Sequence, residues 1–117
     1  MKVSSRTSQT IFLVIQLALL SLSAPAMAGS QTGQVTQILK RANDGLIYIY
    51  MTGQGSGRPS CAANTTYWMV KDENSVTGKQ QLALLMSARA TSQTITIIGA
   101  NSCTRWGDGE DIDYVIW

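Results

Sequence analysis

Residues Leu46–Thr52 have the sequence LIYIYMT, which is the strongest strand pattern in the chain. β-Branched and aromatic residues favour strands, and successive side chains of a strand point to opposite faces. The alternation places Leu46, Tyr48 and Tyr50 on one face. The opposite face carries Ile47, Ile49 and Met51. Because both sets are apolar or aromatic, we expect other parts of the chain to cover both faces.

Strand patterns also occur on both sides of this segment. The turn sequence Asn43-Asp44-Gly45 precedes it and predicts a hairpin with a strand at Gly33–Lys40. Three more segments combine β-branched or aromatic residues with short length. These are Thr65–Val70, Thr94–Gly99 and Ile112–Trp117. The sequence therefore predicts five strands.

Helical spacing occurs once, between the third and fourth predicted strands. Leu82, Leu85 and Met86 recur at intervals of three and four residues, which predicts a helix at about Thr77–Ala90 with these side chains buried. The resulting order is β-β-β-α-β-β. This is the element order of the OB-fold, a small five-stranded Greek-key barrel, and we expect a mainly β domain of that kind.

The first 28 of the 117 residues have the layout of a secretory signal peptide. Lys2 and Arg6 give a positive start, Ile11–Leu22 is an apolar run, and small residues flank a cleavage point after Ala28. The apolar run is shorter than the roughly 20 residues that a membrane span needs. We therefore expect an exported chain of one domain, residues 29–117, in the periplasm or outside the cell, with no stable membrane anchor.

The net charge of +2 comes from this leader. The chain has nine Lys and Arg against seven Asp and Glu, and Lys2 and Arg6 account for the difference. The expected mature domain is therefore neutral. Without a basic stripe it lacks what every nucleic-acid-binding surface requires, so we expect no nucleic-acid partner.

Two cysteines, Cys61 and Cys103, are the only thiols. In an oxidising compartment they predict one disulfide across a separation of 42 residues. A reactive thiol would need an activating neighbour, and the chain contains no His.

The absence of His also argues against an enzyme, because no Ser-His-Asp or Cys-His arrangement can form. The acidic run Asp108–Asp113 does not have the spacing of a calcium loop, and the alternation of Asp111 and Asp113 indicates the solvent face of a strand. The glycines Gly53, Gly55 and Gly57 lack the residues of a phosphate loop. We therefore expect no metal, no cofactor and no catalytic residue.

Two residues qualify as ligand contacts by their position in predicted loops. Arg58 lies in the glycine-punctuated segment Gly53–Pro59, which we expect to be flexible and exposed. Trp106 lies in a polar loop near Cys103. Trp68, between strand residues, is expected in the core instead.

Four short segments in fixed order resemble one protein family. They are Val35–Ile38 (VTQI), Tyr48–Ile49, Cys61–Ala62 followed by Trp68, and Ala90–Ile97 (ATSQTITI) at the end of the predicted helix. Together they resemble the B subunits of AB-type bacterial toxins, of the subtilase-cytotoxin and typhoid-toxin type. The similarity spans about Thr32 to Ile98.

The resemblance implies an OB-fold, secretion, a homopentamer and glycan binding at a shallow pocket. It also implies a sugar contact at Thr32, which stands three residues before Val35 where the family has Ser. The chain departs from the family by lacking its additional Cys in the second strand. The leading hypothesis is an exported glycan-binding module with contacts from Thr32, Arg58 and Trp106. The alternative is a periplasmic structural or protein-interaction domain whose partner is another protein chain.

Overall fold

The structure is a computed structural model that describes residues 27–117. The expected leader lies outside the described residues except for Met27 and Ala28. The described part contains five strands, one α-helix and one short 3-10 helix. They are β1 (Ser30–Lys40), β2 (Ile47–Met51), η1 (Ser60–Ala62), β3 (Trp68–Met69), α2 (Val76–Thr91), β4 (Thr94–Gly99) and β5 (Glu110–Ile116). Apart from η1, this is the predicted order, and β4 has the predicted bounds.

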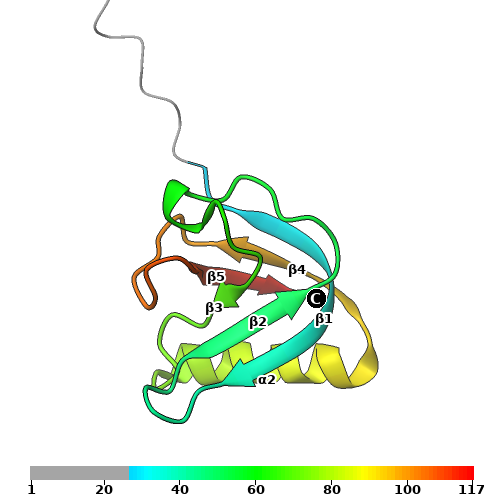
Figure 1. The fold of residues 1–117 in the computed structure, drawn as a ribbon. Coiled ribbons are helices and arrows are strands. Elements are labelled where there is room, and N and C mark those ends of the chain that lie inside the picture. The colour runs from blue at the N-terminus through cyan, green and yellow to red at the C-terminus, as the bar shows by residue number, and fades with distance from the viewer. Residues whose placement is uncertain (1–26) are drawn as a thin grey trace, which may run out of the picture.

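The strands close into a barrel in the order β1-β2-β3-β5-β4 (Figure 1). All neighbours are antiparallel except β3 and β5, which run parallel. Strand β1 is long enough to join two sheets, because Ser30–Gln34 pair with β4 while Val35–Lys40 pair with β2. This shared strand closes the ring and leaves no long unpaired edge.

Both faces of β2 are covered, as its sequence predicts. Ile47 and Ile49 belong to the main core inside the barrel, with Met51 packed against it. Leu46 and Tyr48 form a second cluster with Met69, against which Tyr50 packs. The Tyr48 ring meets the Tyr67 ring edge-on, with centroids 4.9 Å apart. Strand β2 therefore separates two hydrophobic clusters.

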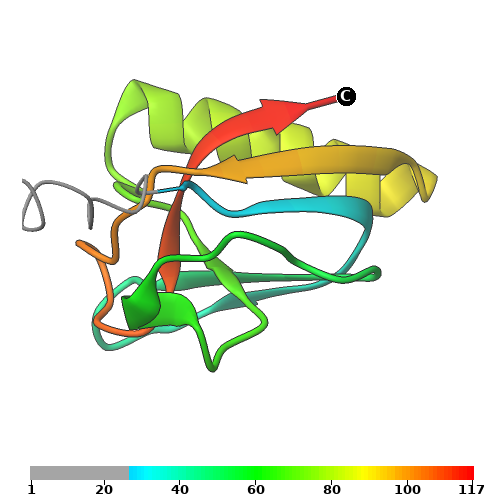
Figure 2. The same cartoon turned by 90° about the horizontal axis from the view of Figure 1, so that it is seen from above.

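Helix α2 lies along one side of the barrel, and η1 with its flanking loops lies on the opposite side (Figures 1 and 2). Ser75 caps the helix by accepting a hydrogen bond from the Gly78 amide at 2.9 Å. Leu85 and Ala88 face the barrel core, with Leu82 partly buried. The prediction that Met86 is buried is wrong, since it is 55% exposed. The buried face of the helix runs through Leu85 and Ala88, which are three residues apart. Met86 therefore lies on the neighbouring face and points to solvent.

Strand β5 departs most from its expected form. It starts at Glu110 rather than Ile112, and Glu110, Asp111 and Ile112 are all buried. The expectation that Asp111 faces solvent is therefore wrong, whereas Asp113 is exposed. The strand changes neighbours here: its first two residues pair with β3, and from Ile112 it pairs with β4, with a register shift between Ile112 and Tyr114. The two carboxylates are both covered, Glu110 by the Gly29 and Asn101 amides and Asp111 by donors of the segment 102–105.

Candidate ligand pocket

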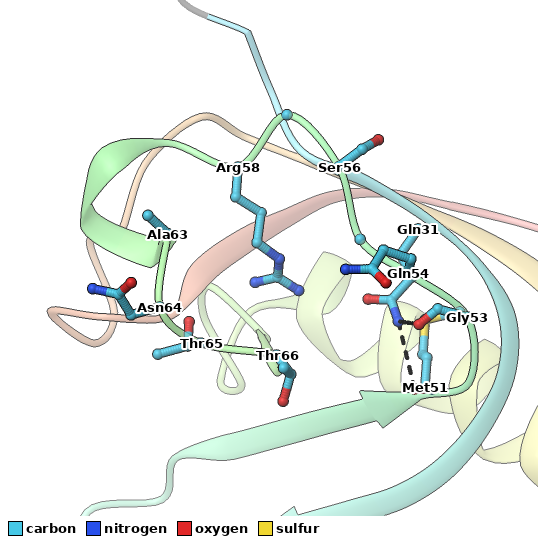
Figure 3. A pocket seen from close by; sticks show the side chains of 12 residues that line it. Gln31, Met51, Gly53, Gln54, Ser56, Arg58, Ala63, Asn64, Thr65 and Thr66 are labelled. Atoms are coloured by element: carbon cyan, nitrogen blue, oxygen red, sulfur yellow. Dashed lines mark hydrogen bonds between the residues drawn. The ribbon is translucent and has the colours of Figure 1, made fainter.

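A pocket of about 610 Å³ is lined by the loops that flank η1, and these loops lie on the side of the barrel opposite α2 (Figure 2). The loop that follows β2 forms one wall, and the segment after η1 forms the other (Figure 3). The lining is mainly polar, from Gln31, Gln54, Ser56, Arg58, Asn64, Thr65 and Thr66, with Met51, Ala63 and the glycines Gly53, Gly55 and Gly57 between them. It is larger than the hollow beside α2 that is described below.

The loop wall keeps its shape through backbone conformations that favour glycine. Gly53 and Gly57 have φ values of +81° and +67°. A side chain at Gly53 would also approach the Thr32 carbonyl oxygen to 2.5 Å. Two hydrogen bonds between Ser30 and Ser56, of 2.8 and 2.9 Å, tie the middle of the loop to the start of β1. The flexible, exposed loop expected from the sequence is thus anchored at its centre.

Gln31 forms part of the pocket floor and is 95% buried, since only 5% of it is exposed. Its Nε2 donates to the carbonyl oxygens of Thr52 and Gly53 at 3.1 and 3.0 Å. Its Oε1 accepts from the Trp68 indole Nε1 at 2.8 Å. Because the amide is bound on both sides, its orientation is fixed.

Arg58 projects from the loop wall into the hollow between the two walls (Figure 3). Its guanidinium carbon lies 4.1 Å from the centroid of the Trp68 ring, a cation–π arrangement. Nη1 donates to the Tyr67 carbonyl oxygen at 2.8 Å. Nη2 is buried and has no hydrogen-bond acceptor within residues 27–117. The guanidinium is therefore held by two contacts and keeps one donor group unused.

Burial lowers the pKa of the Arg58 guanidinium from its ordinary value, and the negative charge of Glu110 opposes that shift. The group nevertheless remains charged at neutral pH, because the ordinary pKa of arginine lies far above neutrality. A buried cation with an unused N–H donor favours binding of an oxygen acceptor.

The second wall is fixed from behind by the disulfide. Cys61 in η1 is bonded to Cys103, as predicted, with the two Cα atoms 6.3 Å apart. Thr65 Oγ1 donates to the Asp108 carbonyl oxygen at 2.6 Å, and Tyr67 donates its hydroxyl to the Asp108 carboxylate. Burial, followed by the contact with Asp108, raises the pKa of Tyr67. The loop that carries Cys103 thus supports the wall that carries Asn64 and Thr65.

The structure does not bring the three predicted contacts into one site. Arg58 lines the pocket. Thr32 is exposed on β1, where its hydroxyl lies 2.8 Å from that of Thr96, and it is not part of the lining. Trp106 is 38% exposed and lies under Arg41, whose guanidinium carbon is 5.1 Å from the ring centroid. It also lies outside the lining.

Sequence reasoning missed Gln31 and the wall at Asn64–Thr66. The tripeptide Asn64-Thr65-Thr66 is a short polar stretch beside a cysteine, and the bridge to Cys103 is the signal that could have placed it in a fixed wall. Gln31 offers no such signal, because its hydrogen-bond partners lie far along the chain, at the end of β2, in the loop after β2 and in β3.

A smaller hollow of about 380 Å³ lies between the β3–α2 connection and the loop before β5. Its polar centre is an ion pair in which Arg105 Nε and Nη2 donate to the two Glu73 carboxylate oxygens at 3.0 and 2.5 Å. The hydrogen bonds from Arg105 lower the pKa of Glu73, and the same pairing raises the pKa of Arg105. Because both charged groups are already paired with each other, this hollow has fewer free hydrogen-bonding groups for a ligand than the pocket at Arg58.

No protein-family model, curated protein or solved structure matches this chain. In the described part of the chain, no helix is both long and apolar enough to cross a membrane. Within the same residues, no three His, Cys, Asp or Glu side chains lie together as a metal site would need.

Proposed function

We propose that this chain is an exported, non-catalytic binding module with an OB-fold, and that its pocket takes a small hydroxyl-rich ligand, a glycan. The order of five strands around a closed barrel, with the helix between β3 and β4, supports the OB-fold. The disulfide is compatible with export to an oxidising compartment. The observation that carries the proposal is the unused, buried Nη2 of Arg58 in a pocket of hydroxyl and amide groups.

The lining indicates recognition by hydrogen bonds. Trp68 is fully buried and Arg58 covers its ring, so the indole face is closed to a sugar. The side chains of Asn64 and Thr66 are exposed and can bind a ligand directly, whereas Arg58 Nη2 is buried and reaches a ligand oxygen only after a small movement of the guanidinium. A planar guanidinium can donate to two neighbouring ligand oxygens, which suits a vicinal diol or a carboxylated sugar.

The resemblance to toxin B subunits implies the same class of ligand but assigns the ligand contact to a different residue. It implies a contact at Thr32, whereas the pocket points to Arg58. A glycan array probed with the exported protein and with the variants Arg58→Gln and Thr32→Ala distinguishes a site at Arg58 from a site at Thr32. We expect the Arg58 variant to lose binding and the Thr32 variant to retain it. The reverse result would move the site to β1, and no sugar bound at millimolar concentration would overturn the proposal.

The second candidate is a protein-interaction domain, and exposed apolar residues on β5 favour it. Tyr114, Ile116 and Trp117 are 59%, 52% and 56% exposed at the end of the chain. A cluster of this kind on a small domain is typical of an interface. The partner we propose for this surface is a second copy of the chain. The toxin resemblance implies the same self-assembly, so such an interface and the glycan pocket are compatible. Light scattering of the exported protein tests this: an assembly that Ile116→Lys dissociates supports it, and a monomer contradicts it.

A further inference from the structure

Glu110 is a fully buried carboxylate at the start of β5, and only part of it is satisfied. Its Oε1 accepts from the backbone amides of Gly29 and Asn101, at 2.9 and 3.1 Å. Its Oε2 is buried without any donor among residues 27–117. Neither of the ion pairs found in this part of the chain includes Glu110. A buried charge with a free oxygen is costly unless a further donor reaches it.

Gly29 packs against this carboxylate, as Gly99 does, and a side chain at position 29 would collide with it. A Cβ at position 29 would lie 2.2 Å from Glu110 Oε2 and 3.1 Å from both the Arg58 Cγ and the Trp68 ring. The position itself is set by residues that follow it in the chain. The Gly99 amide donates to the Gly29 carbonyl oxygen at 2.8 Å, and Ser30 is paired with Ser56. Gly29 should therefore stay in place when the residues before it are removed.

The bond before Gly29 is also the cleavage point that the sequence predicts. Met27 and Ala28 are exposed, whereas Gly29 is buried. The chain thus enters the folded domain at this residue. The Ala-Met-Ala pattern ends at Ala28, so the expected product of a signal peptidase begins with Gly29.

We propose that hydrolysis of the Ala28–Gly29 bond creates an α-ammonium group at Gly29 that forms a buried ion pair with Glu110. Water is the co-reactant: its oxygen enters the new Ala28 carboxylate, and its two hydrogens convert the Gly29 N–H into NH₃⁺. The ammonium supplies three donors where the amide supplies one. One of them continues to bind Oε1, and another is available for Oε2. Export thereby completes a polar centre that the unprocessed chain leaves unsatisfied.

This ion pair depends on the first residue being Gly29. One additional residue would displace the ammonium by about 3.8 Å, the spacing of consecutive Cα atoms, and return an amide to position 29. The inference rests on the predicted leader and is independent of the proposed ligand, because it would hold whatever the pocket binds.

The test uses the full chain, expressed with its leader in a bacterial host that exports it. Mass spectrometry of the exported protein should show Gly29 as the first residue; any other first residue overturns the proposal. A matched variant carries one Ser inserted between Ala28 and Gly29. Each form is prepared with Glu110 and with Glu110→Gln. We expect the insertion to lower Tm by about 5 °C or more with Glu110 and by less than about 2 °C with Gln. Equal losses in both backgrounds would contradict the ion pair.

A second measurement does not depend on the Gln variant folding. The α-amino group of each exported protein is acylated at neutral pH, and its modification is followed by mass spectrometry. A buried, paired ammonium should react at least tenfold more slowly than the terminal amine of the Ser-inserted form. Equal rates would overturn the proposal even if the stability data were incomplete.

Discussion

The guanidinium of Arg58 lies over the ring of Trp68, 4.1 Å from its centroid, and the Trp68 indole in turn donates to Gln31. A fully buried core residue therefore holds two residues of the pocket lining in place. The shape of the pocket and the stability of the core therefore depend on the same side chain.

Replacing Trp68 with Phe should destabilise the fold and disturb the pocket together. The Gln31 amide loses its buried donor, and the smaller ring leaves a cavity, which together should cost about 3 kcal/mol. The measurement is chemical unfolding of the exported protein. Trp106→Phe is the matched control, because Trp106 is 38% exposed, and its cost should stay below about 0.5 kcal/mol. Equal losses at the two positions would contradict this account.

Asp111 and Asp113 lie two residues apart on β5 but should respond differently to amidation. Asp111 is fully buried and accepts hydrogen bonds from Ser102 Oγ, from the Thr104 amide and hydroxyl, and from the Arg105 amide. In Asp111→Asn, an NH₂ group replaces one acceptor oxygen and faces these donors, which should cost roughly 3 kcal/mol. Asp113→Asn should change the free energy of unfolding by less than about 0.5 kcal/mol. A neutral effect at position 111 would refute this hydrogen-bond network.

The ion pair between Glu73 and Arg105 predicts a dependence of stability on pH. The folded protein holds the pKa of Glu73 below its ordinary value of 4.5, so the folded state binds fewer protons there than the unfolded chain. The stabilisation is therefore complete above the ordinary pKa and is lost as the pH falls through the lower, folded-state pKa.

At neutral pH, Glu73→Gln should cost about 1 kcal/mol, because Arg105 is still 27% exposed to water. The difference between wild type and variant should shrink as the pH falls below about 4. Unfolding curves at several pH values check this. In the Arg105→Gln background the Glu73 substitution should have little further effect, and an undiminished effect would argue against the pair.

Removing the disulfide should lower stability and loosen one pocket wall. For a separation of 42 residues, the loss of chain-entropy stabilisation is roughly 4 kcal/mol. The double variant Cys61→Ser, Cys103→Ser should therefore unfold at a much lower denaturant concentration. Any ligand affinity should fall as well, since η1 leads directly into the wall at Asn64–Thr66. A variant with wild-type stability would show that the bridge contributes little.

Gly78→Ala should destabilise the protein although alanine is the better helix former. The added Cβ would lie 1.8 Å from the Asp72 carbonyl oxygen, and the resulting displacement should outweigh the gain in helix propensity by about 1–2 kcal/mol. Gly107→Ala is the control, because a Cβ there has no atom within 4 Å. Thermal unfolding of the two variants should separate them, and a more stable Gly78 variant would contradict the packing described.

The elements that were predictable are those with a local cause. β-Branched residues set the bounds of β4, alternation placed the two faces of β2, and a single pair of cysteines left only one bridge to form. The inward face of α2 was right at Leu85 and wrong at Met86, because the barrel surface determines which neighbouring position is covered.

The features that escaped prediction depend on contacts between distant segments. Asp111 is buried because the segment 102–105 folds over it and supplies four hydrogen-bond donors, which local alternation does not reveal. Gln31 is a pocket residue only because β1 extends to Ser30 and pairs with β4. Arg58 was singled out from its loop, but its contact with Trp68 belongs to the folded barrel.

The loops that line the pocket and helix α2 lie on opposite sides of the barrel, so the domain has two distinct faces. The apolar end of β5 lies on the α2 side, where Gln81 donates to the Asp113 carbonyl oxygen at 3.0 Å (Figure 2). Copies joined through that side would leave every pocket open and facing away from the junction. If each pocket binds a glycan as proposed, a cell surface that carries many copies of that glycan would be held by several sites at once, and such avidity can exceed the affinity of one pocket by about 10²–10⁴-fold.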